Sequence, residues 1–256
     1  MFSVVFAIAR RELKAYFGSP IAFVVLGFFA IVFGMFFVSI LSYFLQTSMM
    51  GAQFGGPQTV NVNQMLIRPL LLNMTVVYLF VLPLITMRTY SEEKRSGTIE
   101  LLLTSPVTDV EIILGKFIGA MGLYCAMLAV SMLHVGLLFA YGNPEWKPIL
   151  TAYLGLVLFG GCFISVGLFI SSLTKNQIVA GMATFAVFLL LWVIDWPSQS
   201  ATPRVAAVLT YLSITQHLED FLKGVIDTQH LVYYISFIGF GLFLTARSVD
   251  SERWRG

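Results

Sequence analysis

The feature that most constrains this chain is a series of six apolar stretches, each long enough to cross a lipid bilayer as a helix. A helix rises about 1.5 Å per residue, so a membrane span needs about 20 predominantly apolar residues. The stretches are residues 21–45, 66–87, 117–141, 149–171, 178–194 and 231–245. Helices satisfy their own backbone hydrogen bonds inside lipid. We therefore predict an all-α membrane protein, a single transmembrane domain with six transmembrane helices.

The composition excludes a soluble fold. Of the 256 residues, 58% are hydrophobic and 11% are charged, whereas a soluble domain carries about 25% charged residues. So few charges cannot solvate the exterior of a soluble domain of this size. A soluble enzyme, a disordered chain and a nucleic-acid-binding module are therefore excluded.

The basic residues are distributed unevenly between the two ends of the predicted spans. Six spans place both termini on one side, and the positive-inside rule selects that side. With the termini in the cytoplasm, the outer segments carry four basic residues, Arg68, Lys147, Arg204 and Lys223. The remaining basic residues lie on inner segments. This bias predicts a multi-pass membrane protein with both termini in the cytoplasm.

Residues 1–19 precede the first span and have an amphipathic pattern. Their apolar side chains recur at helical spacing: Phe2, Phe6, Ala9, Leu13 and Tyr16. Basic side chains lie mostly on the other faces: Arg10, Arg11 and Lys14. The pattern predicts a helix lying flat on the inner membrane surface, with its basic side near anionic headgroups. The alternative is a plain lead-in to the first span.

The inner loop at 88–116 is unusually rich in charge. Thr89-x-x-Glu92 and Thr108-x-x-Glu111 both fit the capping box that begins a helix. Between them, Gly97 is expected to end one helix, and residues 98–104 to form a short helix that stops before Pro106. Its three leucines, Leu101, Leu102 and Leu103, need a cover. That cover could be lipid headgroups, the protein's own spans or a groove on another protein.

The outer segments are short, apart from residues 196–230. There, five apolar residues recur at helical spacing: Ile214, Leu218, Phe221, Leu222 and Val225. This spacing predicts one or two short helices that lie at, or dip into, the outer membrane face. At the outer end of the second span, Arg68 is expected to reach headgroups or pair with an outer acid.

Few motifs carry chemistry. The sequence has no G-x-x-x-x-G-K-[ST] motif for nucleotide phosphates, and its Cys and His residues lack zinc-ligand spacing. Polar residues inside spans are candidates for a functional role, above all His134 and then Asn73. The alternative for His134 is a hydrogen bond to a neighbouring span. Gly115-x-x-x-Gly119 suits close helix packing.

Residues 84–119 resemble the corresponding segment of ABC-2-type ABC-transporter permeases. The matching motifs are Met-Arg-x-x-x-Glu-Glu at 87–93, Gly-Thr-x-Glu-Leu-Leu at 97–102, Thr-x-Pro-Val at 104–107 and Leu-Gly-Lys at 114–116. The Arg-Arg-Glu-Leu run at 10–13, the turn at 172–177 and Gly-Val-Ile-Asp at 224–227 also resemble the family. The resemblance extends over the chain and is strongest to the gliding-motility-associated (Gld-type) branch, with permeases of nitrous-oxide-reductase maturation as relatives.

The resemblance implies a permease subunit of an exporter in the bacterial inner membrane. This subunit would not itself be an enzyme and would bind no cofactor or metal. A separate ABC ATPase subunit would bind ATP and Mg²⁺ and dock on a coupling helix at 97–104. The implied coupling residues are Glu92, Glu93, Gly97, Thr98, Glu100, Leu101, Leu102, Leu103 and Thr104. Candidates for the pathway or gate are Asn73, His134, Phe221 and Leu222. Further implied partners are a second permease copy or paralogue and a Gld-type subunit with a periplasmic domain.

Two other functions compete with this interpretation. One is an ion-coupled secondary transporter or channel, although the six spans lack inverted halves with broken helices. The other is an intramembrane enzyme that uses His134, which would require a Ser or Asp partner at matching depth.

Overall fold

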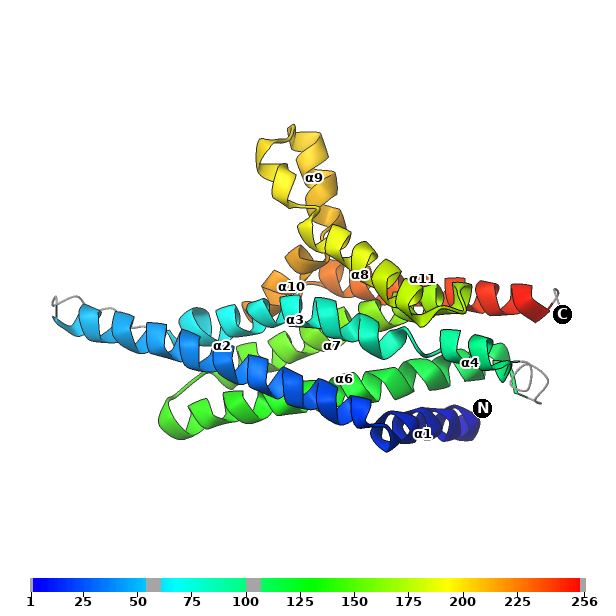
Figure 1. Ribbon diagram of the computed structural model, residues 1–256. Helices are drawn as coiled ribbons and strands as arrows, with labels where there is room; N and C mark the ends of the chain where they lie inside the picture. The colour runs from blue at the N-terminus through cyan, green and yellow to red at the C-terminus, as the bar shows by residue number, and fades with distance from the viewer. Residues whose placement is uncertain (1, 54–60, 100–106, 254–256) are drawn as a thin grey trace.

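The computed structural model describes residues 2–53, 61–99 and 107–253, and these residues form helices and no strand (Figure 1). In chain order the elements are α1 (Phe2–Gly18), α2 (Pro20–Gln53), the π-helical turn η1 (Asn63–Ile67), α3 (Arg68–Thr86), α4 (Ser91–Ser96), α6 (Asp109–Tyr141), α7 (Trp146–Leu173), α8 (Gln177–Val193), the 3₁₀ turn η2 (Trp196–Ser200), α9 (Pro203–Leu212), α10 (Ile214–Leu222) and α11 (Thr228–Arg253).

Six helical stretches among the described residues are long and apolar enough to cross a membrane. They are Pro20–Met50, Asn63–Ser96, Asp109–Tyr141, Trp146–Leu173, Gln177–Ser198 and Thr228–Glu252. The predicted all-α fold with six membrane-crossing helices is therefore confirmed. Each stretch contains one predicted span, and most extend well beyond the apolar residues.

The start of α6 shows why a helix runs past its apolar stretch. The Thr108 hydroxyl accepts a hydrogen bond from the Glu111 amide, and the Glu111 carboxylate accepts one from the Thr108 amide. This is the predicted capping box, which satisfies amides that the first helical turn leaves without partners. The helix therefore starts at Asp109, before the apolar run begins.

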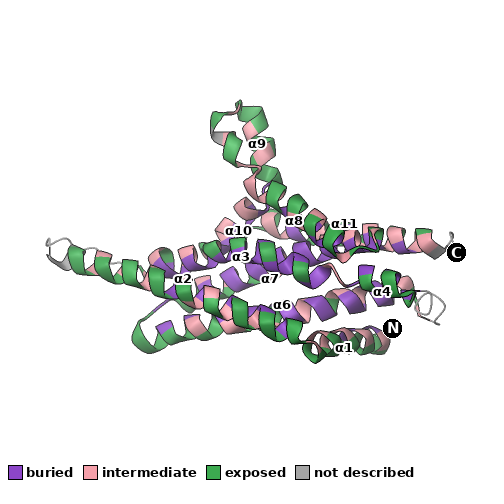
Figure 2. Cartoon of the chain, in the orientation of Figure 1, coloured by how far each residue is buried: buried purple, intermediate pink, exposed green. Residues whose placement is uncertain are grey.

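The core of the bundle lies between α3 and α7, which are the most buried of the spans (Figure 2). Aromatic side chains fill this region and contact one another across helices. The Tyr78 ring stacks on Phe29 at 5.6 Å and meets the Tyr124 ring edge-on at 5.2 Å. Tyr124 also donates a hydrogen bond to the Leu156 carbonyl at 2.7 Å. Since lipid offers no hydrophobic force between helices, such packing and hydrogen bonding hold the bundle together.

The two ends of the bundle differ in what they carry. Both termini lie at the same end as α4 (Figure 1), as an even number of crossings requires. The segment at 196–230 forms α9 and α10, so the predicted short helices are present. Helix α9 projects away from the bundle and buries none of its residues. Helix α10 packs on α7 and α3, and Arg68 pairs with its Glu219 at 3.1 Å, the outer acid expected for this arginine.

Candidate functional site

Helix α1 packs along α6. The close approach depends on small residues of α6: a Cβ added to Gly115 would lie 2.6 Å from the Ile8 side chain, and one added to Gly119 would lie 2.6 Å from Glu12 Cβ. The packing role of the Gly115-x-x-x-Gly119 motif is thereby confirmed. The predicted apolar face is split, because Ala9 is buried whereas Phe2 and Phe6 are exposed.

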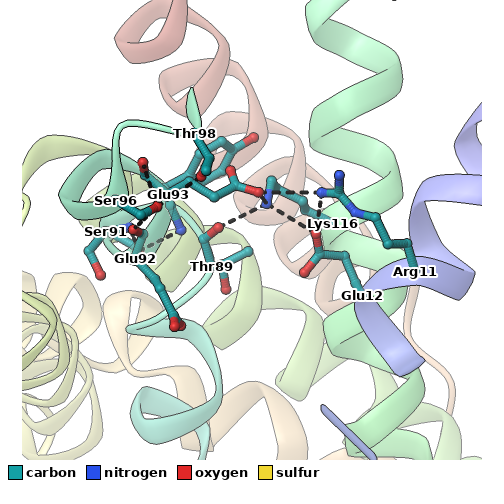
Figure 3. A network of polar contacts seen from close by, with 11 residues as sticks. Arg11, Glu12, Thr89, Ser91, Glu92, Glu93, Ser96, Thr98 and Lys116 are labelled. Atoms are coloured by element: carbon teal, nitrogen blue, oxygen red, sulfur yellow. Dashed lines mark hydrogen bonds and ion pairs between the residues drawn. The ribbon is translucent and has the colours of Figure 1, made fainter. Parts of the chain in front are cut away.

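This contact brings Lys116 into a polar network between α1, α4 and α6 (Figure 3). The Lys116 side chain is 1% exposed, and its ammonium lies 2.8 Å from Glu93 Oε1, 3.2 Å from Glu12 Oε1 and 2.9 Å from the Thr89 carbonyl. The half-exposed Arg11 guanidinium also reaches Glu93 Oε1, at 3.3 Å. A buried ammonium is tolerated only when its hydrogen bonds are satisfied by such partners. We call Arg11, Glu12, Glu93 and Lys116 the inner network.

A serine of α7 forms hydrogen bonds with the turn between α3 and α4. The Ser171 hydroxyl accepts hydrogen bonds from the amides of Tyr90 and Ser91, both at 3.1 Å. The predicted capping box at Thr89 is wrong, because the cap residue of α4 is Tyr90 and no side chain of α4 caps it. The serine from α7 supplies the acceptor that a capping threonine would have supplied.

Helix α4 is further anchored by Lys94, which is buried. Its ammonium donates to the Ser172 carbonyl of α7 and pairs with Glu252 of α11. Together with Glu93, this lysine ties the short helix to three spans. A force applied to α4 would therefore reach α6, α7 and α11 directly.

The predicted coupling residues that the structure describes differ in their surroundings. Glu93 belongs to the inner network, whereas Glu92 is exposed and pairs with Arg88 of the same turn at 3.1 Å. Gly97 ends α4 as predicted, with φ at 74°, a conformation that glycine adopts without steric cost. Thr98 is exposed and contacts the Ser96 hydroxyl at 2.9 Å. The others, Glu100, Leu101, Leu102, Leu103 and Thr104, lie outside the described residues.

A cavity of about 780 Å³ opens between α1 and α4, beside the inner network. Its lining includes two arginines, three glutamates and several apolar residues: Arg11, Arg88, Glu12, Glu92, Glu93, Ile8, Tyr16 and Val107. Tyr16 donates a hydrogen bond to the Ile85 carbonyl at 3.1 Å, and burial raises the pKa of its phenol to about 12. Tyr16 is therefore a neutral anchor between α1 and α3.

The four candidate pathway residues do not come together. The His134 ring lies 5.1 Å from the Phe33 ring and contacts the carbonyl of Val130 on its own helix, so the expected bond to a neighbouring span is replaced by ring contacts with α2. Asn73 is exposed, and its amide donates to the Pro69 carbonyl. Phe221 and Leu222 are buried on α10, with Phe221 against Gly155 of α7.

The sequence interpretation missed the inner network, although it noted its parts separately. Glu12 lies in the Arg-Arg-Glu-Leu run and Lys116 in the Leu-Gly-Lys run, 104 positions apart. A lysine at the inner end of an apolar helix, one residue after a packing glycine, was the signal that pointed to a buried partner.

Comparisons with known proteins agree on one family. The family model described as "ABC-2 family transporter protein" matches residues 6–240. Two curated relatives, the probable multidrug ABC transporter permease YbhR of Escherichia coli K12 and that of Escherichia coli O157:H7, are each 27% identical over 144 residues. The match covers 56% of this chain and 39% of either relative, so the chain spans about two fifths of their length.

Proposed function

Because the chain belongs to the ABC-2 family of transporter proteins, we propose that it is the membrane-spanning permease subunit of an ATP-driven exporter. The family match covers five of the membrane-crossing helices and the first half of the sixth. The sequence has no nucleotide-binding motif, so ATP and Mg²⁺ would bind to a separate ATPase subunit. Both termini and α4 would face the cytoplasm, as the distribution of basic residues favours.

The observation that carries this proposal is the anchoring of α4. Buried contacts tie this helix to α6 through Glu93 and Lys116, and to α7 and α11 through Lys94. An ATPase that binds residues 97–104 would thus act on a short lever connected to the spans. Glu92 is the acid of α4 that remains exposed for a basic group on the ATPase.

The translocation pathway would form between two permeases, either two copies or a copy and a paralogue. Phe221 and Leu222 on α10, with Asn73 and His134 in the spans, are the proposed pathway or gate residues. Movement of α7 would reach α10 through the contact between Gly155 and Phe221.

The proposed docking of an ATPase is tested by a charge substitution in the coupling segment. We expect Glu100→Arg combined with Leu102→Arg to abolish co-purification of the ATPase and transport, because an arginine cannot enter an apolar groove without losing its hydration. A matched control is Glu145→Arg combined with Leu212→Arg, which makes the same change on exposed residues of the proposed outer side. Intact association and transport in the first variant would show that the ATPase binds elsewhere.

We also propose a Gld-type partner that contributes a periplasmic domain. The support is the resemblance to that branch and the shortness of the outer connections. A permease and ATPase reconstituted alone in liposomes should then hydrolyse ATP but transport weakly, and addition of the third subunit should restore transport. Full transport by the two-component complex would contradict this partner.

A further inference from the structure

Two histidines meet where α10 packs beside the first turn of α11. The Nδ1 atoms of His217 and His230 lie 2.7 Å apart. The second ring nitrogen of His230, Nε2, lies 2.9 Å from the Asp220 carboxylate, and that of His217 lies 2.8 Å from the Tyr211 carbonyl. The result is a continuous chain of hydrogen-bond contacts, Asp220–His230–His217–Tyr211, in which each histidine uses both ring nitrogens.

The number of hydrogens that this series of hydrogen bonds needs fixes its charge. The series contains three contacts, and each needs one hydrogen between its two heavy atoms. Two neutral imidazoles carry one N–H each, so whichever tautomers they adopt, one contact sets two acceptors against each other. With one additional proton, His230 donates to both Asp220 and His217, and His217 donates to Tyr211. The geometry is thus satisfied by a pair with a single positive charge.

The surroundings support this distribution of the proton. Hydrogen bonds from Lys223 and His230 lower the pKa of Asp220, so the carboxyl group is ionised and does not supply the missing hydrogen. Burial lowers the pKa of His217, which favours this residue as the neutral member. His217 is 3% exposed, and its ring stacks on the Tyr233 ring with the two centroids 3.8 Å apart. His230 is more accessible and lies against the acid.

We infer that His217 and His230 form a proton-binding site that holds one proton and fastens α10 to the start of α11. Among the charged groups on the packed elements, Arg68 of α3 pairs with Glu219, and Asp195 after α8 accepts a hydrogen bond from Gln216 through Oδ2. Phenols of α9 and α11 complete the surroundings: Tyr211, Tyr233 and Tyr234.

The contact between the helices should be strongest in an intermediate pH range. When pH rises, the pair loses its extra proton. Either the two facing Nδ1 atoms are then both acceptors, or one histidine directs a lone pair at the oxygen of Asp220 or Tyr211, so one hydrogen bond is lost. When pH falls and His217 also becomes charged, two imidazolium rings repel each other at contact distance. The two steps belong to the pair as coupled titrations. That this site faces the periplasm rests on the proposed function, but the proton count does not.

Nitrogen NMR of the full chain tests this inference without any transport assay. The chain has three histidines, so ¹⁵N-histidine labelling in lipid nanodiscs gives few signals, and His134→Gln identifies the one outside the pair. Near neutral pH, we expect one imidazolium protonated at both nitrogens, one neutral ring protonated at Nε2, and a nitrogen–nitrogen coupling across their hydrogen bond. Two neutral rings at every pH between about 5.5 and 8, the range in which histidines change charge, would overturn the inference.

A variant tests the dependence of the two rings on each other. His217→Phe preserves stacking on Tyr233 but removes the acceptor. The imidazolium signal should then disappear at a lower pH than in the wild type, because a hydrogen bond to the charged form is lost. An unchanged titration would overturn the inference. If this variant does not fold, the wild-type spectrum alone decides. Absence of transport by the wild-type complex, together with the expected spectrum, would count against the proposed function and leave the proton site intact.

Discussion

Replacing Lys116 with methionine should cost about 3 to 5 kcal/mol of folding free energy, the range for breaking a buried ion pair from one side. The ammonium is nearly inaccessible and lies between Glu12 and Glu93, whose side chains are 13% and 19% exposed. Without it, the two carboxylates face each other with only the half-exposed Arg11 to compensate them. Thermal unfolding of the purified chain in detergent, followed by circular dichroism, measures the loss.

The control for this prediction is Arg88, which lines the same cavity between α1 and α4 as Glu12 and Glu93. Arg88→Met removes an ion pair with Glu92, whose side chain is half exposed, and such pairs contribute about 1 kcal/mol or less. Adding Glu12→Gln and Glu93→Gln to Lys116→Met should recover most of the loss, because no uncompensated charge then remains buried. If Lys116→Met unfolds at the same temperature as Arg88→Met, the inner network does not stabilise the fold.

Some of this fold follows from local patterns in the sequence. Hydropathy and length predict the six crossings, because a lipid-facing helix must be apolar along its whole length. The beginning of α6 is predictable from Thr108 and Glu111, since a capping box uses residues three positions apart. Gly97 ends α4 for a similarly local reason, its positive φ.

Contacts between distant segments are what the sequence does not reveal. Thr89 matched the capping pattern, but Ser171 of α7 satisfies the amides instead, and no local rule indicates which acceptor is used. Glu93 was expected to face a partner protein and instead binds Lys116. His217 and His230 went unnoticed, because a separation of 13 residues does not show that the rings of two residues on different helices meet.

Substituting leucine for Gly119 should detach α1 from α6 and destabilise the chain by at least about 3 kcal/mol, the upper range for overpacking a tight contact. A Cβ at this position would lie 2.6 Å from Glu12 Cβ and 3.3 Å from the Ala9 carbonyl oxygen, and a backbone atom cannot move without its helix. A Cβ added to Gly136, in the same helix, would have no atom within 4 Å. Gly136→Leu should therefore be neutral or slightly stabilising, since leucine favours helix over glycine.

Limited trypsin digestion measures the detachment, because Arg10, Arg11 and Lys14 lie on α1 and an undocked helix opens for cleavage. Gly119→Leu should be cut there much faster than the wild type, whereas Gly136→Leu should match the wild type.

The same shift of α1 withdraws Glu12 from Lys116, so the packing contact and the ion pair are physically linked. Lys116→Met should therefore add much less destabilisation in the Gly119→Leu background than alone. Full additivity would mean that α1 stays docked despite the leucine.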